Sequence, residues 1–269
     1  MINDLRGAWG LVTGASSGIG ADFARELAKN GLNLVLVARR ESKLELLKSK
    51  LQQDYNIEVE VIVADLTLVN SAQEVFNQAT NNRSVQVLIN NAGRGQYGPM
   101  LSNSLKDHTD TINLNITSLT QLTYLFLEHM SKHNLESYIS NIASIASYVT
   151  LPYFGIYTGS KRYVKDFTLA LYDEYKTSNI HFCCISPGGT YTEFMDHAGQ
   201  ELTKQGHASM MSSEKVVDIG IKAMNSKKAL VVTGILNKLL TLLPRFFPEK
   251  LFFVIAGKIM QSSVNIKRL

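Results

Sequence analysis

Short apolar runs alternate along the chain with longer stretches in which apolar residues recur every three or four positions. The apolar runs lie at residues 9–13, 32–38, 58–64, 85–89, 135–143 and 181–186. Runs of this length predict buried β-strands, and the amphipathic stretches between them, such as 41–54 and 103–133, predict helices. Strands that alternate with helices form a parallel sheet covered by helices on both faces. We therefore expect an α/β fold with a doubly wound parallel sheet.

Composition and charge narrow the classes of function. The chain has 269 residues, of which 45% are hydrophobic, so it is long enough for a sizeable core and too apolar for disorder. Its 27 basic and 23 acidic residues give a net charge of +4, which is too small to indicate nucleic-acid binding. Residues 1–6 are too few and too polar for a signal peptide, and no apolar run reaches the roughly 18 residues of a spanning helix.

Cysteine and histidine usage gives two further expectations. The two cysteines, Cys183 and Cys184, are neighbours, which suits neither a disulfide framework nor a metal site. We therefore expect a reducing compartment and a cytoplasmic protein. The six histidines form no metal-binding motif, and we expect no catalytic metal.

The first predicted strand runs into a glycine-rich turn that opens a helix. Residues 13–20 read Thr-Gly-Ala-Ser-Ser-Gly-Ile-Gly, and a second strand follows at 32–38. Gly14 permits a tight exit from the strand, whereas Gly18 and Gly20 let the backbone approach a pyrophosphate and let the helix pack on the sheet. This order of elements is typical of a dinucleotide-binding βαβ unit, although the spacing G-x-x-x-G-x-G differs from the usual G-x-G-x-x-G.

The end of the second strand indicates which dinucleotide is bound. NAD sites usually place an acid here for the ribose 2′-hydroxyl, whereas NADP sites place a cation for the 2′-phosphate. This chain has Arg39 and Arg40 and no acid before Glu41. Because a guanidinium suits phosphate geometry, we predict NADP(H). The alternative is that both arginines are solvated charges at the start of a helix, and for Arg40 this interpretation stays open.

Polar and small residues follow the third and fourth predicted strands. Asp65 and Leu66 follow the third strand, and an acid there either accepts a hydrogen bond from the adenine amino group or caps the next helix. Asn91, Ala92 and Gly93 follow the fourth strand, where they either let the backbone pass beneath a ligand or tie two strand ends together. Ligands bind beyond the carboxyl ends of parallel strands, so these residues are expected at one site.

A tyrosine and a lysine form the main catalytic candidate. Tyr157 and Lys161 lie four positions apart in a predicted helix and share a face. An ammonium beside a phenol favours the phenolate, so we expect Lys161 to lower the pKa of Tyr157 from its usual ~10. Ser144 lies thirteen residues before Tyr157, at the end of an apolar run. The second such pair, Tyr172 and Lys176, has a glycine at the matching position, so we interpret it as helix surface.

In order and in spacing, these motifs resemble the short-chain dehydrogenase/reductase family. The resemblance rests on residues 13–20 and 90–93, Ser144, the Tyr157–Lys161 pair and Pro187-Gly188, and covers about residues 6–235. It implies a single-domain Rossmann-type sheet of seven parallel strands with helices on both faces. The catalytic domain would span residues 1–234, with a substrate lid at about 191–212 and a C-terminal helical extension at 235–269.

The resemblance also implies roles for single residues. Tyr157 would be the acid/base, and Ser144 would orient the substrate oxygen. Lys161 would bind the nicotinamide ribose, and Asn115, rather than Asn113, would help to hold a water in the proton relay. The implied cofactor contacts are Gly14, Ser16, Ser17, Gly18, Ile19, Gly20, Arg39, Asp65, Leu66, Asn91, Ala92, Gly93, Tyr157, Lys161, Pro187, Gly188, Thr190 and Thr192.

The substrate side is expected to be apolar. The expected lining of the lid is Tyr191, Phe194, Met195, Met210 and Met211. The leucine- and phenylalanine-rich residues 234–264 have three interpretations: a helix pair packed on the domain or on a second subunit, which we favour, an interfacial membrane anchor, or a wall of the substrate channel.

The leading functional hypothesis is an NADP(H)-dependent oxidoreductase that interconverts a ketone or aldehyde and an alcohol. The substrate is expected to be hydrophobic or lipid-like, and the resemblance implies a homodimer or homotetramer. The alternative is a catalytically silent NADP(H)-binding sensor. The intact set of Ser144, Tyr157 and Lys161 argues against it, because a sensor needs a pocket but no proton donor.

Overall fold

The first strand of the chain lies inside the sheet, with neighbours on both sides. The computed structural model describes residues 1–194 and 210–242. Seven parallel strands stand in the order β3-β2-β1-β4-β5-β6-β9. Their bounds are β1 Trp9–Thr13, β2 Asn33–Ala38, β3 Val59–Val63, β4 Val85–Asn90, β5 Ser137–Ile142, β6 Ile180–Ser186 and β9 Leu230–Val232. The expected doubly wound parallel sheet is confirmed.

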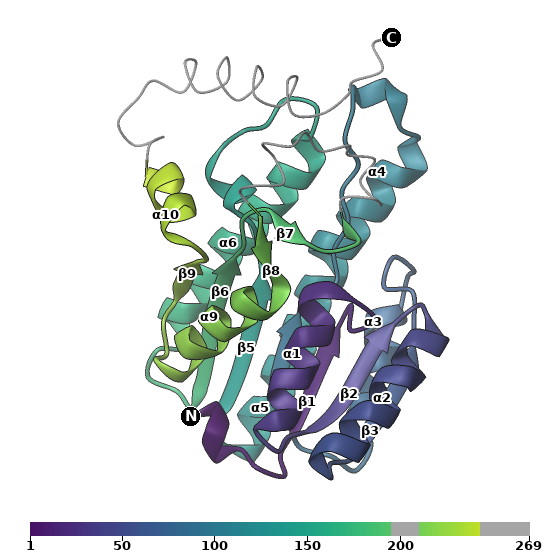
Figure 1. Cartoon of the computed structure of the whole chain (residues 1–269), viewed down its shortest axis with the longest axis vertical. Helices are drawn as coiled ribbons and strands as arrows, with labels where there is room; N and C mark the ends of the chain where they lie inside the picture. Colours follow the sequence, from purple (N-terminus) through teal and green to yellow (C-terminus); the bar gives the residue numbers. More distant parts are fainter. Residues whose placement is uncertain (195–209, 243–269) are drawn as a thin grey trace.

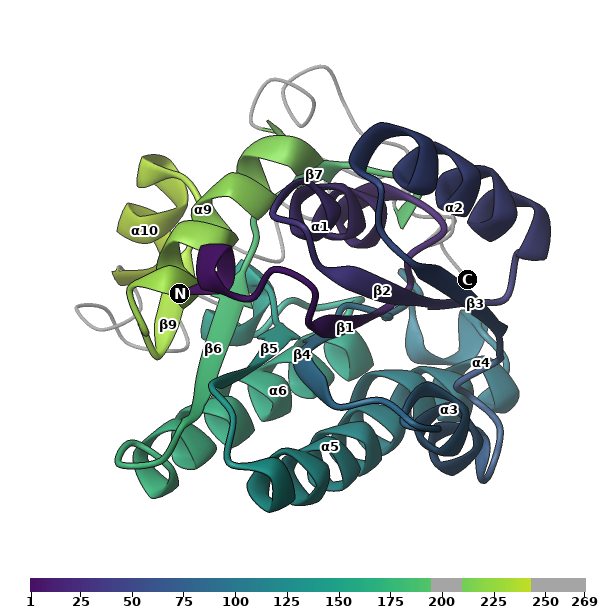
Figure 2. The same cartoon turned by 90° about the horizontal axis from the view of Figure 1, so that it is seen from below.

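Helices cover both faces of this sheet, as seen from below in Figure 2. One face carries α1 (Gly18–Lys29), α2 (Glu41–Tyr55) and α9 (Ser213–Asn225), and the other carries α3 (Ser71–Ala79), α5 (Leu119–His133) and α6 (Gly155–Glu174). The apolar residues of each layer form their own buried cluster against the sheet. Phe23 and Leu27 of α1 and the leucines of α2 at 44, 47 and 51 are buried, as their helical spacing predicts.

The helical region predicted at residues 103–133 is broken into three parts. The chain forms α4 (Leu105–Ile112), a π-helical stretch (Asn113–Ser118) and then α5. Asn115 lies within the π-helical stretch, is fully buried, and hydrogen-bonds to main-chain atoms outside the helix. π-Helical turns inside α-helices occur frequently at functional sites, because they redirect one side chain.

Shorter elements lie above the carboxyl ends of the strands. These are β7 (Thr190–Tyr191), which pairs with β8 (Met211–Ser212), and the helix α10 (Ile235–Leu242) (Figure 1). Most of the expected lid at 191–212, including Met195, and the end of the C-terminal extension lie outside the described residues. None of the described helices is both long and apolar enough to cross a membrane.

Candidate active site

A single large cavity gathers the predicted site residues at the carboxyl ends of the strands. Its volume is about 790 Å³, and its walls come from the glycine-rich turn, the ends of β2 to β5, the start of α6 and the segment after β6. Eighteen of the twenty predicted residues line it: Gly14, Ser16, Ser17, Gly18, Ile19, Arg39, Asp65, Leu66, Asn91, Ala92, Gly93, Ser144, Tyr157, Lys161, Pro187, Gly188, Thr190 and Thr192. Gly20 and Asn115 are not among the lining residues.

The glycine-rich turn leaves room for a phosphate at the start of α1. No side chain caps the helix at Ser17, so its first N–H groups are open to a ligand. Gly18 has a positive φ of 53°, and a Cβ there would lie 2.7 Å from Cγ2 of Thr192. A Cβ on Gly20 would lie 2.3 Å from the oxygen of Gly14. A dinucleotide pyrophosphate therefore fits this turn, and a larger residue at either position does not.

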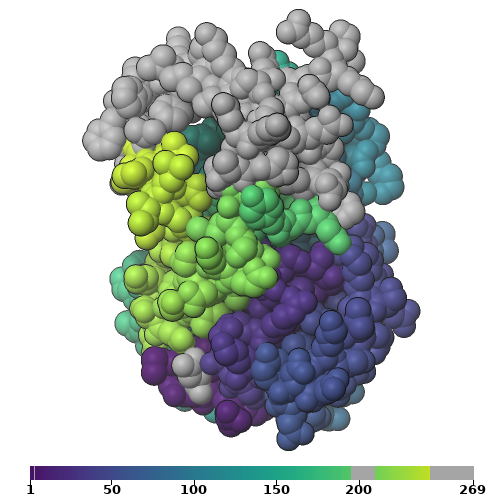
Figure 3. Space-filling view, viewed as in Figure 1, coloured from purple at the N-terminus to yellow at the C-terminus, as the bar shows by residue number. Residues whose placement is uncertain are grey.

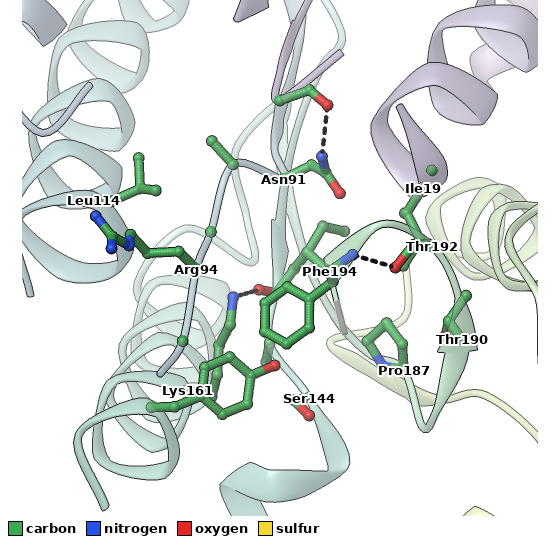
Figure 4. Close-up of a pocket in the computed structure, with 18 of the residues that line it drawn as sticks. Ile19, Asn91, Arg94, Leu114, Ser144, Lys161, Pro187, Thr190, Thr192 and Phe194 are labelled. Carbon is green, nitrogen blue, oxygen red and sulfur yellow. Dashed lines mark hydrogen bonds between the residues drawn. The ribbon is translucent and has the colours of Figure 1, made fainter. Parts of the chain in front are cut away.

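Asn91 and Thr13 tie the ends of β4 and β1 together. The hydroxyl of Thr13 accepts hydrogen bonds from the N–H groups of Asn91 and Ala92, each at 3.0 Å. The side-chain amide of Asn91 donates to the oxygen of Thr13 at 3.0 Å and to that of Gly14 at 3.4 Å. Figure 4 shows Asn91 and its hydrogen bond to the glycine-rich turn. The strand-tying interpretation of this asparagine is therefore what the structure displays, and the same residue also lines the cavity.

The two arginines after β2 point to different places. Arg39 is 66% exposed and lies 3.8 Å from the carboxylate of Asp65. The side chain of Arg40 points to the glycine-rich segment 13–20, where its guanidinium donates to the hydroxyls of Ser16 and Ser17 at 2.8 Å each. The interpretation of Arg40 as a solvated charge is therefore wrong. A basic group that follows β2 thus meets two hydroxyls of the glycine-rich turn, and such a set of donors suits an anionic group of a ligand.

Asp65 stabilises a turn of its own rather than a helix. Its carboxylate accepts hydrogen bonds from the N–H and the hydroxyl of Thr67, at 3.0 and 2.8 Å, whereas α3 begins only at Ser71. Burial opposes its ionisation, but these hydrogen bonds and the nearby Arg39 hold the pKa of Asp65 below its usual value. The helix-capping interpretation is wrong, and the carboxylate stays ionised at the cavity wall.

Tyr157, Ser144 and Lys161 meet at the far end of the cavity. The hydroxyl of Ser144 lies close enough to that of Tyr157 to favour the ionised form of the phenol. The ammonium of Lys161 donates to the oxygen of Ile142 at 2.7 Å and lies 5.9 Å from the centroid of the Tyr157 ring (Figure 4). The second pair differs: Lys176 is exposed and pairs with Asp173. The structure thus distinguishes the Tyr157–Lys161 pair from the Tyr172–Lys176 pair, as the sequence predicts.

The predicted lowering of the tyrosine pKa is not found in the protein alone. Burial raises the pKa of Tyr157 to about 12, and the nearby hydroxyl of Ser144 offsets this only in part. Burial also lowers the pKa of Lys161 to about 8. Because Lys161 points to a main-chain oxygen and not to the phenol oxygen, its charge does not overcome the desolvation of the ring.

Asn115 links the π-helical stretch to the strand end that carries Gly93. Its side chain accepts from the N–H of Arg94 at 2.9 Å and donates to the oxygen of Arg94 at 2.8 Å. It also donates to the hydroxyl of Ser160 at 2.9 Å, one position before Lys161. Asn113 instead donates to the oxygen of Thr67. Of the two asparagines, Asn115 is therefore the one that hydrogen-bonds to α6, the helix that carries Tyr157 and Lys161.

Comparison with known proteins decides the family. The model of the short-chain dehydrogenase family matches residues 9–203, which is most of the chain. The chain belongs to this family.

Relatives of this short-chain dehydrogenase include hydroxysteroid dehydrogenases. It is 30% identical over 240 residues to 17-beta-hydroxysteroid dehydrogenase type 3 of Homo sapiens, covering 86% of this chain and 75% of that one. It is 32% identical over 183 residues to hydroxysteroid dehydrogenase-like protein 1 of Gallus gallus, covering 67% of this chain. The match spans only 55% of that avian protein.

Solved structures of the family bind either nicotinamide dinucleotide. A short-chain dehydrogenase of Sphingobium yanoikuyae in complex with NADPH superposes with a TM-score of 0.80 at 27% identity, covering 90% of this chain and 97% of that one. A family member of Burkholderia phymatum in complex with NAD has a TM-score of 0.79 at 23% identity, covering 90% and 94%. The family is thus one of NAD(P)(H)-binding oxidoreductases.

Aromatic side chains surround the tyrosine of this short-chain dehydrogenase. The ring of Phe154 stacks on Tyr157 with centroids 4.4 Å apart, and Phe194 lies 5.4 Å away at a tilt. Tyr97 packs edge-on against Phe154. Figure 4 shows Phe194 over the space between Lys161 and the segment that carries Thr192. Of the predicted apolar lining of the lid, Phe194 lines the cavity, whereas Tyr191, Met210 and Met211 do not, and Tyr191 is 52% exposed.

The C-terminal helix contributes to the same cavity. Leu240 and Thr241 of α10 line it, whereas Ile235, Leu236 and Leu239 are exposed. Of the three interpretations of this region, the described residues therefore support the channel wall. The packing on the domain that we favoured is also present in the described residues, since α10 contacts residues 145–148 and its Asn237 side chain packs on Gly188.

Two charged residues of the site were missed from the sequence. Arg94 lines the cavity on the side away from Pro187 and Thr190 (Figure 4) and forms ion pairs with Asp107 at 3.0 Å and Asp110 at 3.3 Å. Glu193 bonds to Arg40 across the glycine-rich turn. The signal for Arg94 was its place directly after Asn-Asn-Ala-Gly, whereas nothing in the sequence points to Glu193.

Proposed function

We propose that this short-chain dehydrogenase interconverts a hydrophobic ketone or aldehyde and the matching alcohol, with NADP(H) as its cofactor. The observation that carries the proposal is the meeting of the Ser144 and Tyr157 hydroxyls at one end of a cavity whose other end is the glycine-rich turn. When bound there, NADP(H) supplies or accepts the hydride.

Residues of the protein itself carry out proton transfer and hold the substrate oxygen. Tyr157 gives a proton to the substrate oxygen in reduction and takes it back in oxidation, because its side chain lines the cavity beside Ser144, whereas the ammonium of Lys161 donates to a main-chain oxygen. Ser144 holds the same oxygen through its hydroxyl. Lys161 supplies a positive charge 5.9 Å from the tyrosine ring, and Asn115 fixes the helix that carries it through Ser160.

The proposed substrate class follows from the walls around Tyr157. Phe154, Phe194 and Leu240 are apolar and line the cavity, which suits an apolar substrate. The names of the relatives point the same way, since 17-beta-hydroxysteroid dehydrogenase type 3 is named for a steroid alcohol and very-long-chain 3-oxoacyl-CoA reductase for a long-chain 3-oxoacyl group. We expect a steroidal or long-chain ketone to be a better substrate than a small aldehyde.

The preference for NADP(H) rests on the charges at the end of β2. Arg39 and Arg40 line the cavity there, and among the described lining residues the nearby carboxylates are those of Asp65 and Glu193, each of which pairs with one of these arginines. Arg39→Ala and Arg40→Ala are each expected to weaken NADPH binding by about 1.5–3 kcal/mol and NADH binding by much less. Equal losses for the two cofactors would contradict the assignment.

The experiment for the reaction is NADPH consumption with a carbonyl panel that runs from small aldehydes to long-chain 3-keto and steroidal ketones. Tyr157→Phe is expected to abolish turnover and to retain NADPH binding. Tyr172→Phe is the matched control, because it removes the same hydroxyl from the second Tyr-x-x-x-Lys pair of the same helix. Full activity of Tyr157→Phe would refute its role. Tight NADPH binding without turnover on any compound would favour a sensor.

A further inference from the structure

Three consecutive residues cross the cavity from wall to wall. Thr192 packs against Gly18 of the glycine-rich turn, and the ring of Phe194 lies 5.4 Å from that of Tyr157. Between them, the carboxylate of Glu193 reaches Arg40. All three residues line the cavity. In Figure 3, the green surface of the segment near residue 190 adjoins the purple and blue surface of the N-terminal third, to which the turn and α2 belong. We call residues 192–194 the crossing segment.

Glu193 occupies a site built for an anion. Its carboxylate accepts from the guanidinium of Arg40 at 2.6 Å and from the ammonium of Lys43 at 2.5 Å. The same guanidinium donates to the hydroxyls of Ser16 and Ser17 at 2.8 Å. Two cations and two hydroxyls at one point form the donor set that binds phosphate groups in proteins. The carboxylate is strongly held in its ionised form, because hydrogen bonds from Lys43 and Arg40 hold the pKa of Glu193 at about 2.

We propose that Glu193 is an internal competitor for this anion site, and that the 2′-phosphate of NADP(H) displaces it. The inference rests on the proposed NADP(H) site, because the end of β2 is where such a fold receives the group on the ribose 2′ position. A phosphate with nearly two negative charges cannot bind to Arg40 and Lys43 beside the Glu193 carboxylate without strong repulsion. One of the two anions must leave.

Displacement of Glu193 also changes the substrate side of the cavity. Glu193 stands directly between Thr192 and Phe194, so its release frees the segment that holds the Phe194 ring against Tyr157. NADPH therefore opens the approach to Tyr157, whereas NADH, which lacks the phosphate, leaves the segment in place. Because coupling is reciprocal, a substrate that moves Phe194 away from Tyr157 strengthens NADPH binding by the same factor.

The first test is calorimetric binding of NADPH, NADH and adenosine 2′-monophosphate to the wild type and to Glu193→Gln, which keeps the size of the side chain. The variant is expected to bind NADPH and adenosine 2′-monophosphate about 5- to 30-fold more tightly, the effect of removing one like charge beside a phosphate at a partly exposed site. NADH binding is expected to stay within about twofold, since no phosphate meets the lost charge. Glu45→Gln is the matched control, because Glu45 pairs with a lysine of α2 outside the cavity.

Adenosine 2′-monophosphate separates this inference from the cofactor assignment. Tighter binding of this probe by Glu193→Gln supports the competition even if the wild type does not prefer NADPH, in which case only the proposed cofactor preference fails. Unchanged binding of the probe overturns the competition even if NADPH is preferred. If Glu193→Gln binds all three ligands more weakly by the same factor, Glu193 helps to hold each ligand instead of competing with it, and this also overturns the proposal.

A second measurement follows the crossing segment itself. Phe194→Trp places an indole beside Tyr157, and the single natural tryptophan, Trp9, lies in β1 under Arg83 and serves as a constant background. We expect adenosine 2′-monophosphate to shift the emission of Phe194→Trp, and the double variant with Glu193→Gln to show the shifted emission without any ligand. The same emission in the single and double variants would refute the coupling of Glu193 to Phe194.

Discussion

The sharpest quantitative prediction concerns two buried threonines whose hydroxyls differ in their hydrogen bonds. Thr13 is 1% exposed, and its hydroxyl accepts from the N–H groups of Asn91 and Ala92. Thr233 is 0% exposed, and its hydroxyl has no hydrogen-bonding partner within residues 1–194 and 210–242. Replacement by valine removes the hydroxyl in both cases and keeps the shape of the side chain.

The expected effects have opposite signs. In Thr13→Val, the N–H of Ala92 loses its acceptor and that of Asn91 keeps only the oxygen of Ile89 at 3.1 Å, so we expect a loss of about 1–3 kcal/mol in the free energy of unfolding. Thr233→Val removes a buried hydroxyl that lacks a hydrogen-bonding partner, and we expect the free energy of unfolding to rise by about 0.5–2 kcal/mol. Thr13→Ser keeps the acceptor and is expected to recover most of the loss.

Urea unfolding followed by Trp9 fluorescence and by circular dichroism measures the three free energies. The slope with urea should stay constant, since none of the changes alters the surface exposed on unfolding. Thr13→Val should also weaken NADPH binding, because the lost acceptor holds the segment that carries Gly93 in the cavity wall. If the two valine variants agree within about 0.5 kcal/mol, hydrogen bonding by Thr13 is not what stabilises the strand ends.

Three further changes test other parts of the site. Gly20→Ala is expected to lower stability by about 1–3 kcal/mol through overpacking, and to weaken NADPH binding in calorimetry, because its Cβ would lie 2.3 Å from a main-chain oxygen of the turn. Burial lowers the pKa of His129 below 6.5. The contribution of neutral His129 to stability is therefore complete above pH 6.5 and is lost as the pH falls through the pKa of the folded state. Melting temperatures measured from pH 5 to 8 should fall toward the acidic end, and His129→Gln should reduce this pH dependence. Burial lowers the pKa of Lys161 to about 8 and raises that of Tyr157 to about 12, so turnover should fall above about pH 8 as Lys161 loses its charge. In Lys161→Arg, which keeps the charge, the pH at which turnover falls should rise by at least about one pH unit.

Much of the fold could be predicted from the sequence, because its signals are local. The apolar runs and amphipathic stretches gave the six strands that they indicated and the helices between them, and the glycine-rich turn followed from three glycines within seven residues. The carboxyl ends of parallel strands share one edge, so residues such as Asp65, Asn91 and Ser144 were expected together, and all three line the cavity. The catalytic and cofactor roles of these residues stay predictions.

The errors arose where a side chain depends on distant packing. Arg39 and Arg40 are neighbours, so no pattern reveals that the turn after β2 aims Arg40 at Ser16 and Ser17. Its partner Glu193 is 153 positions away in the sequence. The pKa of Tyr157 was predicted from the charge of Lys161 alone, whereas desolvation, which depends on the packed structure, has the larger effect.

The order of the strands also sets how the sheet can be assembled as the chain is made. β2 and β3 add to one side of β1, after which β4, β5, β6 and β9 add in turn to the other side, so each new strand joins an existing edge and none is inserted between two others. Until the three residues of β9 arrive, the growing edge is β6, six of whose seven residues are buried in the finished protein. An unpaired apolar edge of this kind recruits other chains. We therefore expect the yield of refolding to fall steeply with protein concentration, and variants that weaken β9 to increase that loss before they change the activity of the molecules that do fold.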